Sequence, residues 1–222
     1  MMQASQIPLL ERDLAALPAE VADAIAILNL PVCSEPPVEG HYLCCENSCL
    51  VLNTVDGEKL QPVLSKPAKL SAKQPLLRAL APARGGTVID ATAGLAGDSL
   101  MLAMITDRVI AIERNPVVFA LLVSALNAAS SGSLSMAGKI EPHYGDAINL
   151  IPLLPAADVI FIDPMFPAKR KRSALPPKAV RVLRNIVGDD MDDFQLLHVA
   201  RQHALRRVVV KRPLHAQPLA SD

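Results

Sequence analysis

Four acidic residues end four successive apolar segments of the chain. Asp90 ends TVID, Glu113 ends VIAIE, Asp146 ends KIEPHYGD and Asp163 ends VIFID. The acids are separated by 23, 33 and 17 residues, and each interval suits one strand-helix-strand unit. A single acid at a strand end is commonly the N-cap of the next helix. Four in succession predict one shared crevice, because ligands of parallel sheets bind beyond the carboxyl ends of the strands.

The chemistry that these acids suit is the binding of an uncharged or cationic ligand. Glu113, at the end of the second strand, can accept both hydroxyls of a ribose. Asp146 can accept the exocyclic amine of an adenine, and Asp98 adds a negative charge near the start of a helix. Such a crevice favours a cofactor that carries positive charge and no phosphate. S-adenosyl-L-methionine, with its ammonium and sulfonium groups, fits that description.

The turn after the first of these strands reads DATAGLAGDS. Gly94 and Gly97 lack a Cβ atom, so the backbone can turn tightly there and approach a ligand closely. Ala96 lies two residues after Gly94, and the turn therefore lacks the dinucleotide fingerprint G-x-G-x-x-G. A nicotinamide cofactor is disfavoured for this reason.

The segment VIFIDPMFPAKRKR, residues 159–172, places an acid and an aromatic residue at the end of an apolar strand, with four cations behind them. The net charge of the chain is zero, which argues against a uniformly basic protein that coats nucleic acid. However, residues 169–212 contain twelve Lys or Arg and four Asp, a net charge of about +8 that leaves about −8 for the remainder. This asymmetry indicates an anionic partner for one face of the protein.

Strand-like and helical segments alternate from Gly86 onward. The strands TVIDA, VIAIE, KIEPHYGD, DVIFID and RVVVK are rich in β-branched residues, and each reads as buried on both faces. Helices are predicted over residues 98–104, 115–129, 147–153, 177–187 and 192–205. The alternation predicts an α/β fold with a Rossmann-like, doubly wound, mostly parallel sheet and helices on both faces.

The first third of the chain has a different pattern. A helical period covers residues 9–28, and HYLCCE and SCLVLNT read as two short strands joined by a turn at Asn47 and Ser48. We therefore predict a small N-terminal α+β lobe over residues 1–65 and a connector over residues 66–85 that leads into a helix. The Rossmann-like domain is predicted over residues 86–222.

The four cysteines all lie in the predicted lobe, at positions 33, 44, 45 and 49. Their spacing is that of neither a zinc site nor a disulfide framework, so we expect buried thiols and no metal. No signal peptide opens the chain, and no apolar run approaches the ~18 residues of a membrane span. We expect a soluble, cytoplasmic protein without a membrane partner, and the sequence does not indicate its oligomeric state.

Four motifs together resemble a known family. DATAGLAGDS, IERNPVVFALL, DPMFP and RVVVKRP occur in this order over residues 85–213 and are similar to motifs of the 16S rRNA guanine-N2 methyltransferases of the RsmJ family. The resemblance implies a class I methyltransferase that uses S-adenosyl-L-methionine and acts on 16S rRNA or on the small ribosomal subunit. The cofactor contacts that it implies are Gly97, Asp98, Glu113, Arg114, Gly145, Asp146 and Asp163. The strand-end argument adds Asp90, and the glycine turn adds Gly94.

The chain departs from the family pattern in several places, and one is the segment AKLSAKQPLLRAL before the first strand, which lacks the glycines of the family's basic segment. Gly97-Asp98 stands where Arg-Asp is common, and Gly145-Asp146 stands where a Ser-Ser pair is familiar. The family fold would also add an antiparallel pair of strands after the fifth strand. Because the chain ends at Asp222, we expect either that this pair is missing or that the sheet is closed differently.

The tetrapeptide Asp163-Pro164-Met165-Phe166 resembles the D/N-P-P-Y/F motif of enzymes that methylate exocyclic amines of bases. The resemblance implies that Asp163 and the carbonyl group of Pro164 accept the two amine hydrogens, while prolines fix the shape of the loop. Phe166 would stack on the base, a contact worth ~1–3 kcal/mol. The cations predicted to contact RNA phosphates are Lys169, Arg170, Lys171, Arg172, Lys211 and Arg212.

Three other interpretations fit parts of the pattern. The same motif permits an amino-methyltransferase that acts on DNA adenine or on a protein side chain. The chain could instead be an RNA-binding assembly factor that kept the fold and lost catalysis. A purely structural interpretation has Asp163 as the cap of the next helix and Phe166 in the core.

Overall fold

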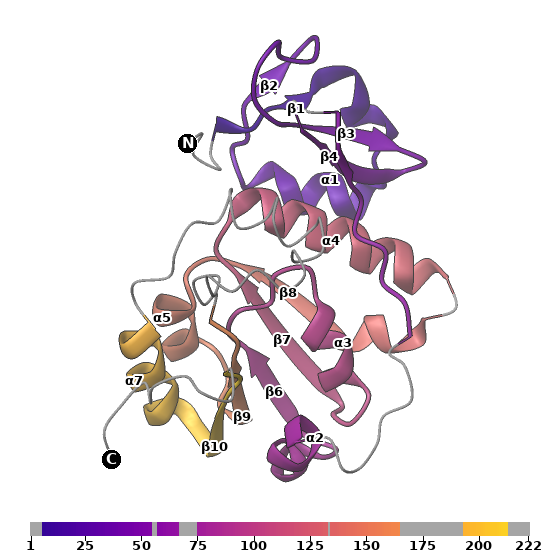
Figure 1. Cartoon of the computed structure of the whole chain (residues 1–222). Coiled ribbons are helices and arrows are strands. Elements are labelled where there is room, and N and C mark those ends of the chain that lie inside the picture. The colour runs from indigo at the N-terminus through magenta and orange to yellow at the C-terminus, as the bar shows by residue number, and fades with distance from the viewer. Residues whose placement is uncertain (1–5, 55–56, 67–74, 133, 165–192, 213–222) are drawn as a thin grey trace, which may run out of the picture.

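The computed structural model describes residues 6–54, 57–66, 75–132, 134–164 and 193–212, which form two sheets with helices (Figure 1). One sheet has five parallel strands in the order β10-β9-β6-β7-β8. Its strands are β6 (Thr87–Asp90), β7 (Arg108–Glu113), β8 (Ile140–Tyr144), β9 (Ala157–Ile162) and β10 (Ala204–Val210). The predicted doubly wound, Rossmann-like parallel sheet is confirmed.

The strand order places a topological switch point at β6, the first strand of the parallel sheet. From β6 the chain moves outward to β7 and then β8, and it returns to the other side of β6 to form β9 and β10. The connections that leave the carboxyl ends of β6 and β9 therefore diverge. In parallel α/β sheets this divergence creates the crevice in which ligands bind.

Alternating side chains of the parallel strands supply two apolar faces. Val88, Val109 and Phe161 belong to one core, which also contains residues of α3 (Gly97–Ala103), α4 (Pro116–Ser131) and η4 (Ser135–Lys139). Ile89 and Ile110 belong to the core on the opposite face, with residues of α5 (Ala147–Leu150), η5 (Ile151–Leu153) and α7 (Asp193–His203). The predicted helices over residues 98–104, 115–129 and 147–153 therefore match observed ones, and the one over residues 177–187 lies outside the described residues.

The two outer strands correct one expectation. We expected every strand to be buried on both faces, but most of β8 is only half-buried and three consecutive residues of β10 are exposed. Among the described residues each of these strands pairs with one neighbour, so one edge is open to solvent. The helix expected to reach Leu205 ends at His203, and β10 begins with the next residue.

The N-terminal lobe contains a mixed sheet in the order β2-β1-β3-β4-β5. Its elements are β1 (Leu9–Leu10), η2 (Glu11–Ala16), α1 (Ala19–Ala26), β2 (Val32–Cys33), β3 (Tyr42–Glu46), β4 (Cys49–Asn53) and β5 (Lys59–Leu60). The predicted hairpin is confirmed, with φ of 51° at Asn47 and 62° at Ser48, as a two-residue turn of this hand requires. The continuous helix expected over residues 9–28 is wrong, because β1 joins the sheet and Pro18 starts a separate helix.

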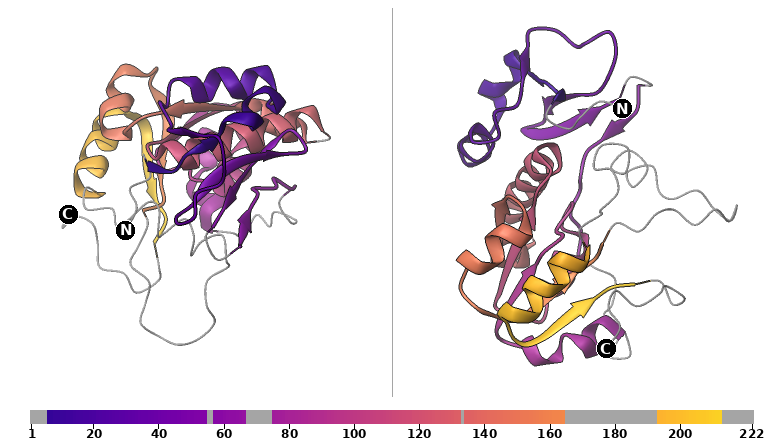
Figure 2. Two further views of the ribbon diagram at one scale, coloured as in Figure 1. Left: turned by 90° about the horizontal axis from the view of Figure 1, so that it is seen from above. Right: turned by 90° about the vertical axis from the view of Figure 1, so that its left-hand side faces the viewer.

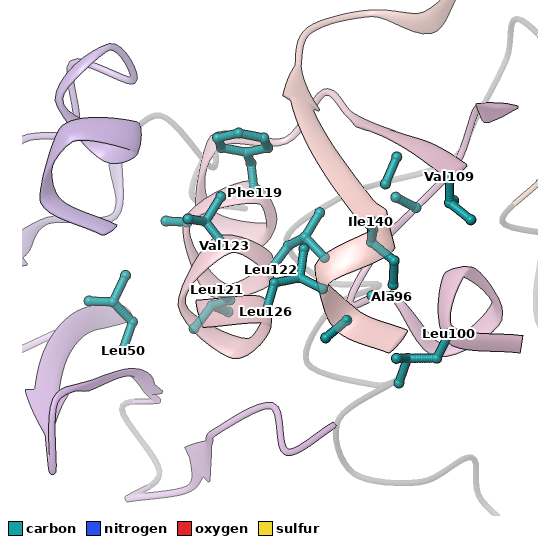
Figure 3. Packing of buried hydrophobic residues seen from close by; sticks show 14 of the residues in the cluster. Leu50, Ala96, Leu100, Val109, Phe119, Leu121, Leu122, Val123, Leu126 and Ile140 are labelled. Carbon is teal, nitrogen blue, oxygen red and sulfur yellow. The ribbon is translucent and has the colours of Figure 1, made fainter. Parts of the chain in front are cut away.

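Helix α4 separates the lobe from the parallel sheet (Figures 1 and 2). Every residue from Val117 to Leu126 is buried, because the helix packs against α1 and β4 on one side and against the parallel sheet on the other. Figure 3 shows Leu50 of β4 on one side of α4 and Ile140 of β8 on the other. The hydroxyl oxygen of Ser124 accepts a hydrogen bond from the backbone N–H of Leu50 at 2.8 Å. Lobe and parallel sheet thus share one continuous core.

The connector leads into α2 (Pro75–Ala79) and η3 (Ala81–Ala83), as expected from the sequence. These elements lie at the amino end of β6, away from the carboxyl edge of the sheet (Figure 1). A cavity of about 310 Å³ lies there, lined by Pro75, Arg78, Ala79 and Arg207. None of the predicted cofactor or catalytic residues lines it.

Candidate active site

The four predicted acids lie at or directly beyond the carboxyl ends of the parallel strands. Asp90 and Glu113 are the last residues of β6 and β7, and Asp163 directly follows β9. Asp146 lies two residues beyond the end of β8. Because β9, β6, β7 and β8 are consecutive in the sheet, these acids share one edge of it.

Asp90 is the most deeply buried of the four, with 1% of its surface exposed. Its carboxylate accepts hydrogen bonds from the hydroxyl of Ser99 at 2.6 Å and from the backbone N–H of Thr92 at 3.2 Å. Burial raises the pKa of Asp90 to about 7; the two hydrogen bonds oppose this shift, and the nearby charges of Asp98 and Asp163 add to it. A carboxyl group in this state can exchange a proton near neutral pH.

The turn after β6 is held in place by its neighbours. Gly94 has a φ of 53° and donates its N–H to Oε2 of Glu113 at 3.0 Å. Ala96 has a φ of 62°, a left-handed conformation that costs an L-residue about 1–2 kcal/mol, and it is buried at the start of α3. The backbone N–H of Ala93 bonds to the carbonyl of Ile112 at 3.0 Å. The turn therefore presents its backbone at the crevice in one defined shape.

Glu113 is buried, and backbone amides fix both of its carboxylate oxygens. Oε1 accepts the N–H of Asn115 at 2.7 Å, and Oε2 accepts that of Gly94. Asn115 in turn caps α4, since its side-chain oxygen accepts the N–H groups of Val117 and Val118. A carboxylate oxygen has more than one acceptor site, so this fixed group can still accept the hydroxyls of a ribose. The next predicted contact, Arg114, is exposed.

Gly145 and Asp146 lie beside the end of β7. Gly145 has a φ of 145° and donates its N–H to the carbonyl of Glu113 at 3.0 Å. A Cβ atom at this position would lie 2.9 Å from a methyl carbon of Leu150, so a larger residue would displace that side chain. Asp146 is the N-cap of α5, with Oδ1 accepting the N–H of Ile148 at 2.8 Å. The cap role is thus established for this acid, and its contact with an adenine stays a prediction.

Asp163 is held by residues of two other loops. Its backbone N–H donates to the hydroxyl oxygen of Thr92, in the turn after β6, at 2.7 Å. Its side-chain Oδ2 lies 2.9 Å from Nζ of Lys211. Pro164 is buried next to it. The aromatic residue of the predicted motif, Phe166, and the cations Lys169, Arg170, Lys171 and Arg172 lie outside the described residues.

Lys211 was predicted to contact RNA phosphates, yet its ammonium group lies between two carboxylates. Besides Asp163 it contacts Oδ2 of Asp98 at 2.5 Å. The side chains of Lys211, Asp163 and Asp98 are 47%, 33% and 21% exposed, so this cluster borders solvent. The neighbouring Arg212 is half-buried. Phosphate contacts of Lys211 and Arg212 stay predictions.

Sequence reasoning missed three polar residues of this edge. Thr92 and Ser99 hold Asp163 and Asp90, and nothing in the local sequence indicates these long-range partners. Asn115 precedes Pro116, and this pairing is a typical helix start that could have identified the cap. All three add hydrogen bonds that fix the orientation of a predicted site residue.

Within the described part of the chain, no group of three or more His, Cys, Asp or Glu side chains could hold a metal ion. Among the helices that the structure describes, none has the length and apolar character needed to cross a membrane.

Comparisons with known proteins agree with this geometry. Residues 50–222 match a family described as "Putative SAM-dependent methyltransferase". The chain is 36% identical, over 203 residues, to ribosomal RNA small subunit methyltransferase J of Alteromonas mediterranea, which covers 85% of this chain and 78% of that protein. It is 42% identical to the protein of the same name from Rhodopseudomonas palustris over 178 residues, 78% of this chain and 79% of the relative.

A solved structure extends the likeness to the whole fold. The crystal structure of an S-adenosylmethionine-dependent methyltransferase from Neisseria gonorrhoeae superposes with a TM-score of 0.75 at 27% sequence identity. The match covers 96% of this chain and 87% of that one, so it includes the lobe as well as the parallel sheet.

Proposed function

The chain belongs to the family of S-adenosylmethionine-dependent methyltransferases that includes ribosomal RNA small subunit methyltransferase J, and on that premise we propose that it methylates the exocyclic N2 amine of a guanosine in 16S rRNA. The observation that carries the proposal is the position of Asp163. Asp163 lies at the switch point of the sheet, directly after β9. Its backbone N–H is held by Thr92 in the turn after β6, and its carboxylate is held by Lys211 at the end of β10.

The cofactor, S-adenosyl-L-methionine, fits the chemistry of the neighbouring residues. Glu113 offers a fixed carboxylate for the ribose, and the turn that contains Gly94 and Ala96 presents backbone close to the crevice. Asp98, in the first turn of α3, supplies negative charge that suits its ammonium and sulfonium groups. When bound, the cofactor supplies an electron-poor methyl carbon whose bond to sulfur breaks as the new N–C bond forms, the electron pair staying on sulfur.

The role of the chain's own residues is to prepare the amine. The lone pair of a guanine amine is delocalised into the ring, so the nitrogen is a weak nucleophile. Asp163 and the carbonyl oxygen of Pro164 would accept its two hydrogens, which directs the lone pair out of the plane of the base. Fixed acceptors of this kind act chiefly through orientation and electrostatic preorganisation. After transfer the nitrogen loses one proton, which the carboxylate of Asp163 can receive and pass to solvent.

The positive charge of residues 169–212 suits RNA as the methyl acceptor. The basic segment over residues 169–212 follows the acceptor motif directly, and RNA recognition of this kind typically reads an unpaired base in a loop or at an end. The relatives named after the small ribosomal subunit rRNA support the choice of substrate. Action on ribosomal RNA would place the protein in the cytoplasm, with 16S rRNA or the small subunit as its partner.

The test is nucleoside analysis after reaction with defined acceptors. The purified chain is incubated with S-adenosyl-L-methionine and with 16S rRNA or small subunits from cells that lack the protein. Mass spectrometry should then detect new N2-methylguanosine. N6-methyladenine in DNA, or methylated protein, would favour an amino-methyltransferase with another substrate. If calorimetry shows no binding at millimolar cofactor, the chain is a non-catalytic assembly factor.

A further inference from the structure

We propose that Lys211 is a positioning residue for methyl transfer: its ammonium group holds Oδ2 of Asp163, so that Oδ1 is the oxygen presented to the acceptor amine. This inference rests on the proposed role of Asp163 in catalysis. It replaces the interpretation of Lys211 as one more phosphate-binding cation of the basic segment.

The backbone of the sheet fixes the position of Lys211 beside Asp163. In β10 and β9, Val210 pairs with Ile162, so that Lys211 and Asp163 are the first residues beyond two parallel neighbouring strands. The backbone N–H of Lys211 still donates to the carbonyl of Ile162 at 2.9 Å, and the strand ladder thus extends to this residue. A group built on paired strands holds its position better than a group on a free loop.

A second anchor comes from the other side of the crevice. Asp98 lies in the first turn of α3, directly after the glycine turn, and its Oδ2 is 2.5 Å from Nζ of Lys211. The ammonium group therefore joins the segments that follow β6, β9 and β10, three adjacent strands of the sheet. Thr92, also after β6, binds the backbone N–H of Asp163. Backbone and side chain of the acid are thus both held by neighbouring loops.

The charges around Asp163 give Lys211 an electrostatic role as well. Two acids of neighbouring elements act on this region, Asp98 from α3 and Asp90 from β6, and Lys211 is the cation that contacts Asp163 within the described residues. Burial raises the pKa of Asp163, the ammonium group of Lys211 lowers it, and Asp98 raises it. For Lys211, burial opposes the charged form, but the hydrogen bonds to Asp98 and Asp163 leave its pKa raised, so it stays cationic.

The consequence for catalysis follows from the hydrogen-bonding roles of a carboxyl group. Ionised, Asp163 can only accept hydrogen bonds, as the amine hydrogens require; protonated, it would offer a donor to the substrate. Without Lys211, no ammonium charge would offset the negative charge of Asp98 and Asp90 near Asp163. Asp163 would then become protonated at a higher pH. The lysine would thus fix both the orientation and the charge state of the acceptor.

Kinetics of Lys211→Met and Lys211→Arg test the proposal. The Met variant should lower kcat at saturating rRNA and cofactor by about tenfold to a hundredfold, the usual cost of a misplaced reacting group. Its KM for rRNA should change less than twofold, roughly the scatter of such measurements. The acidic limb of its pH profile should move to higher pH, and the Arg variant should restore much of kcat. Lys59→Met is the matched control, because Lys59 forms a surface ion pair with Glu46 in the lobe.

A phosphate contact would give a different result. Lys211→Met would then raise KM for rRNA, leave kcat and the pH profile unchanged, and reduce the salt dependence of binding by about one released ion. That outcome would overturn the proposal.

A second measurement decides the question even if the substrate is not rRNA. In protein labelled with ¹³C at aspartate carboxyl carbons, NMR titration gives the pKa of Asp163, with Asp163→Asn used for assignment. This pKa should rise in Lys211→Met and stay unchanged in Lys59→Met, while circular dichroism confirms that each variant is folded. An unchanged pKa would refute the role of Lys211. Absence of methylated rRNA with wild-type protein would refute only the proposed function.

Discussion

Along α4, ten consecutive residues from Val117 to Leu126 are buried, and their side chains divide between the lobe and the parallel sheet. At the carboxyl edge of β6, β9 and β10, by contrast, Asp98 and Asp163 contact a single ammonium group, and the buried Asp90 lies near both acids. The buried hydroxyl of Ser124 in α4 has a backbone partner, whereas at the edge the charge of Asp98 raises the pKa of both Asp90 and Asp163.

The difference indicates that the two regions have different roles. Around α4, apolar packing and satisfied hydrogen bonds stabilise the fold and join the lobe to the sheet. At the carboxyl edge the chain accepts a buried carboxyl group and a left-handed alanine, both of which cost free energy. Such local conflicts typically occur where function requires them, because the surrounding structure is stable enough to hold them in place. Substitutions in the two regions should therefore affect different observables.

The largest expected effect is that of Asp163→Ala on catalysis. Loss of the amine acceptor should lower kcat by about a thousandfold, or ~4 kcal/mol, comparable with the loss of a key preorganised group. The melting temperature should change little, since removal of one acid also relieves repulsion with Asp98 and Asp90. Methyl transfer to rRNA and thermal unfolding measure the two effects. Retained activity would contradict the catalytic role.

Leu121→Ala should produce the opposite pattern. Leu121 is fully buried in α4, and its truncation should lower the free energy of unfolding by about 3 kcal/mol. Urea denaturation measures this loss. At a temperature where the variant is folded, kcat should stay within about twofold of the wild type, because the cavity lies away from the reacting groups. A large loss of kcat in the folded variant would show that the two regions are coupled.

Asp90→Asn tests how much stability the protein loses when the buried carboxyl group of Asp90 ionises. The pKa of Asp90 in the folded state is about 7, above its ordinary value of 3.8, so the folded protein binds this proton more tightly than the unfolded chain does. The stability that this proton contributes is present below about pH 4 and is lost as the pH rises through 7. Wild-type protein should therefore lose about 3 kcal/mol between pH 5 and pH 8 that the Asn variant does not lose. Urea denaturation of both proteins at several pH values measures their free energies of unfolding. If these free energies depended on pH in the same way, the raised pKa of Asp90 would be contradicted.

The smallest expected effect is that of Glu113→Gln on cofactor binding. The amide keeps the size of the side chain but removes the charge that we assign to the ribose hydroxyls, which should raise Kd for S-adenosyl-L-methionine about tenfold, or ~1.4 kcal/mol. Isothermal titration calorimetry measures this change. The matched control is Glu141→Gln, because Glu141 of β8 pairs with Arg108 of β7 and is not a predicted cofactor contact. An equal loss in both variants would contradict a specific role for Glu113.

Much of the fold can be predicted from local sequence patterns. Runs of β-branched residues mark four of the five parallel strands, and Asn47 and Ser48 mark the lobe hairpin. The four acids are found by the same reasoning, because a strand that ends in an acid places it at the carboxyl edge. The helix predicted over residues 9–28 failed because Leu9 and Leu10 pair with β2 and β3, which follow them in the chain.

The sequence by itself determined that a parallel α/β sheet forms, that acids end its strands and that the Asp163-Pro164 pair follows β9. It did not determine which acid each cation would contact. Lys211 is 113 residues from Asp98 and 48 from Asp163, and Thr92 is 71 residues from Asp163. Local periodicity specifies the elements and leaves the order of the strands open, because it gives the apolar residues of each strand and not the strand that lies beside it. Only the order β10-β9-β6 brings these segments together, and the tertiary structure thereby turned a surface lysine into the partner of two carboxylates.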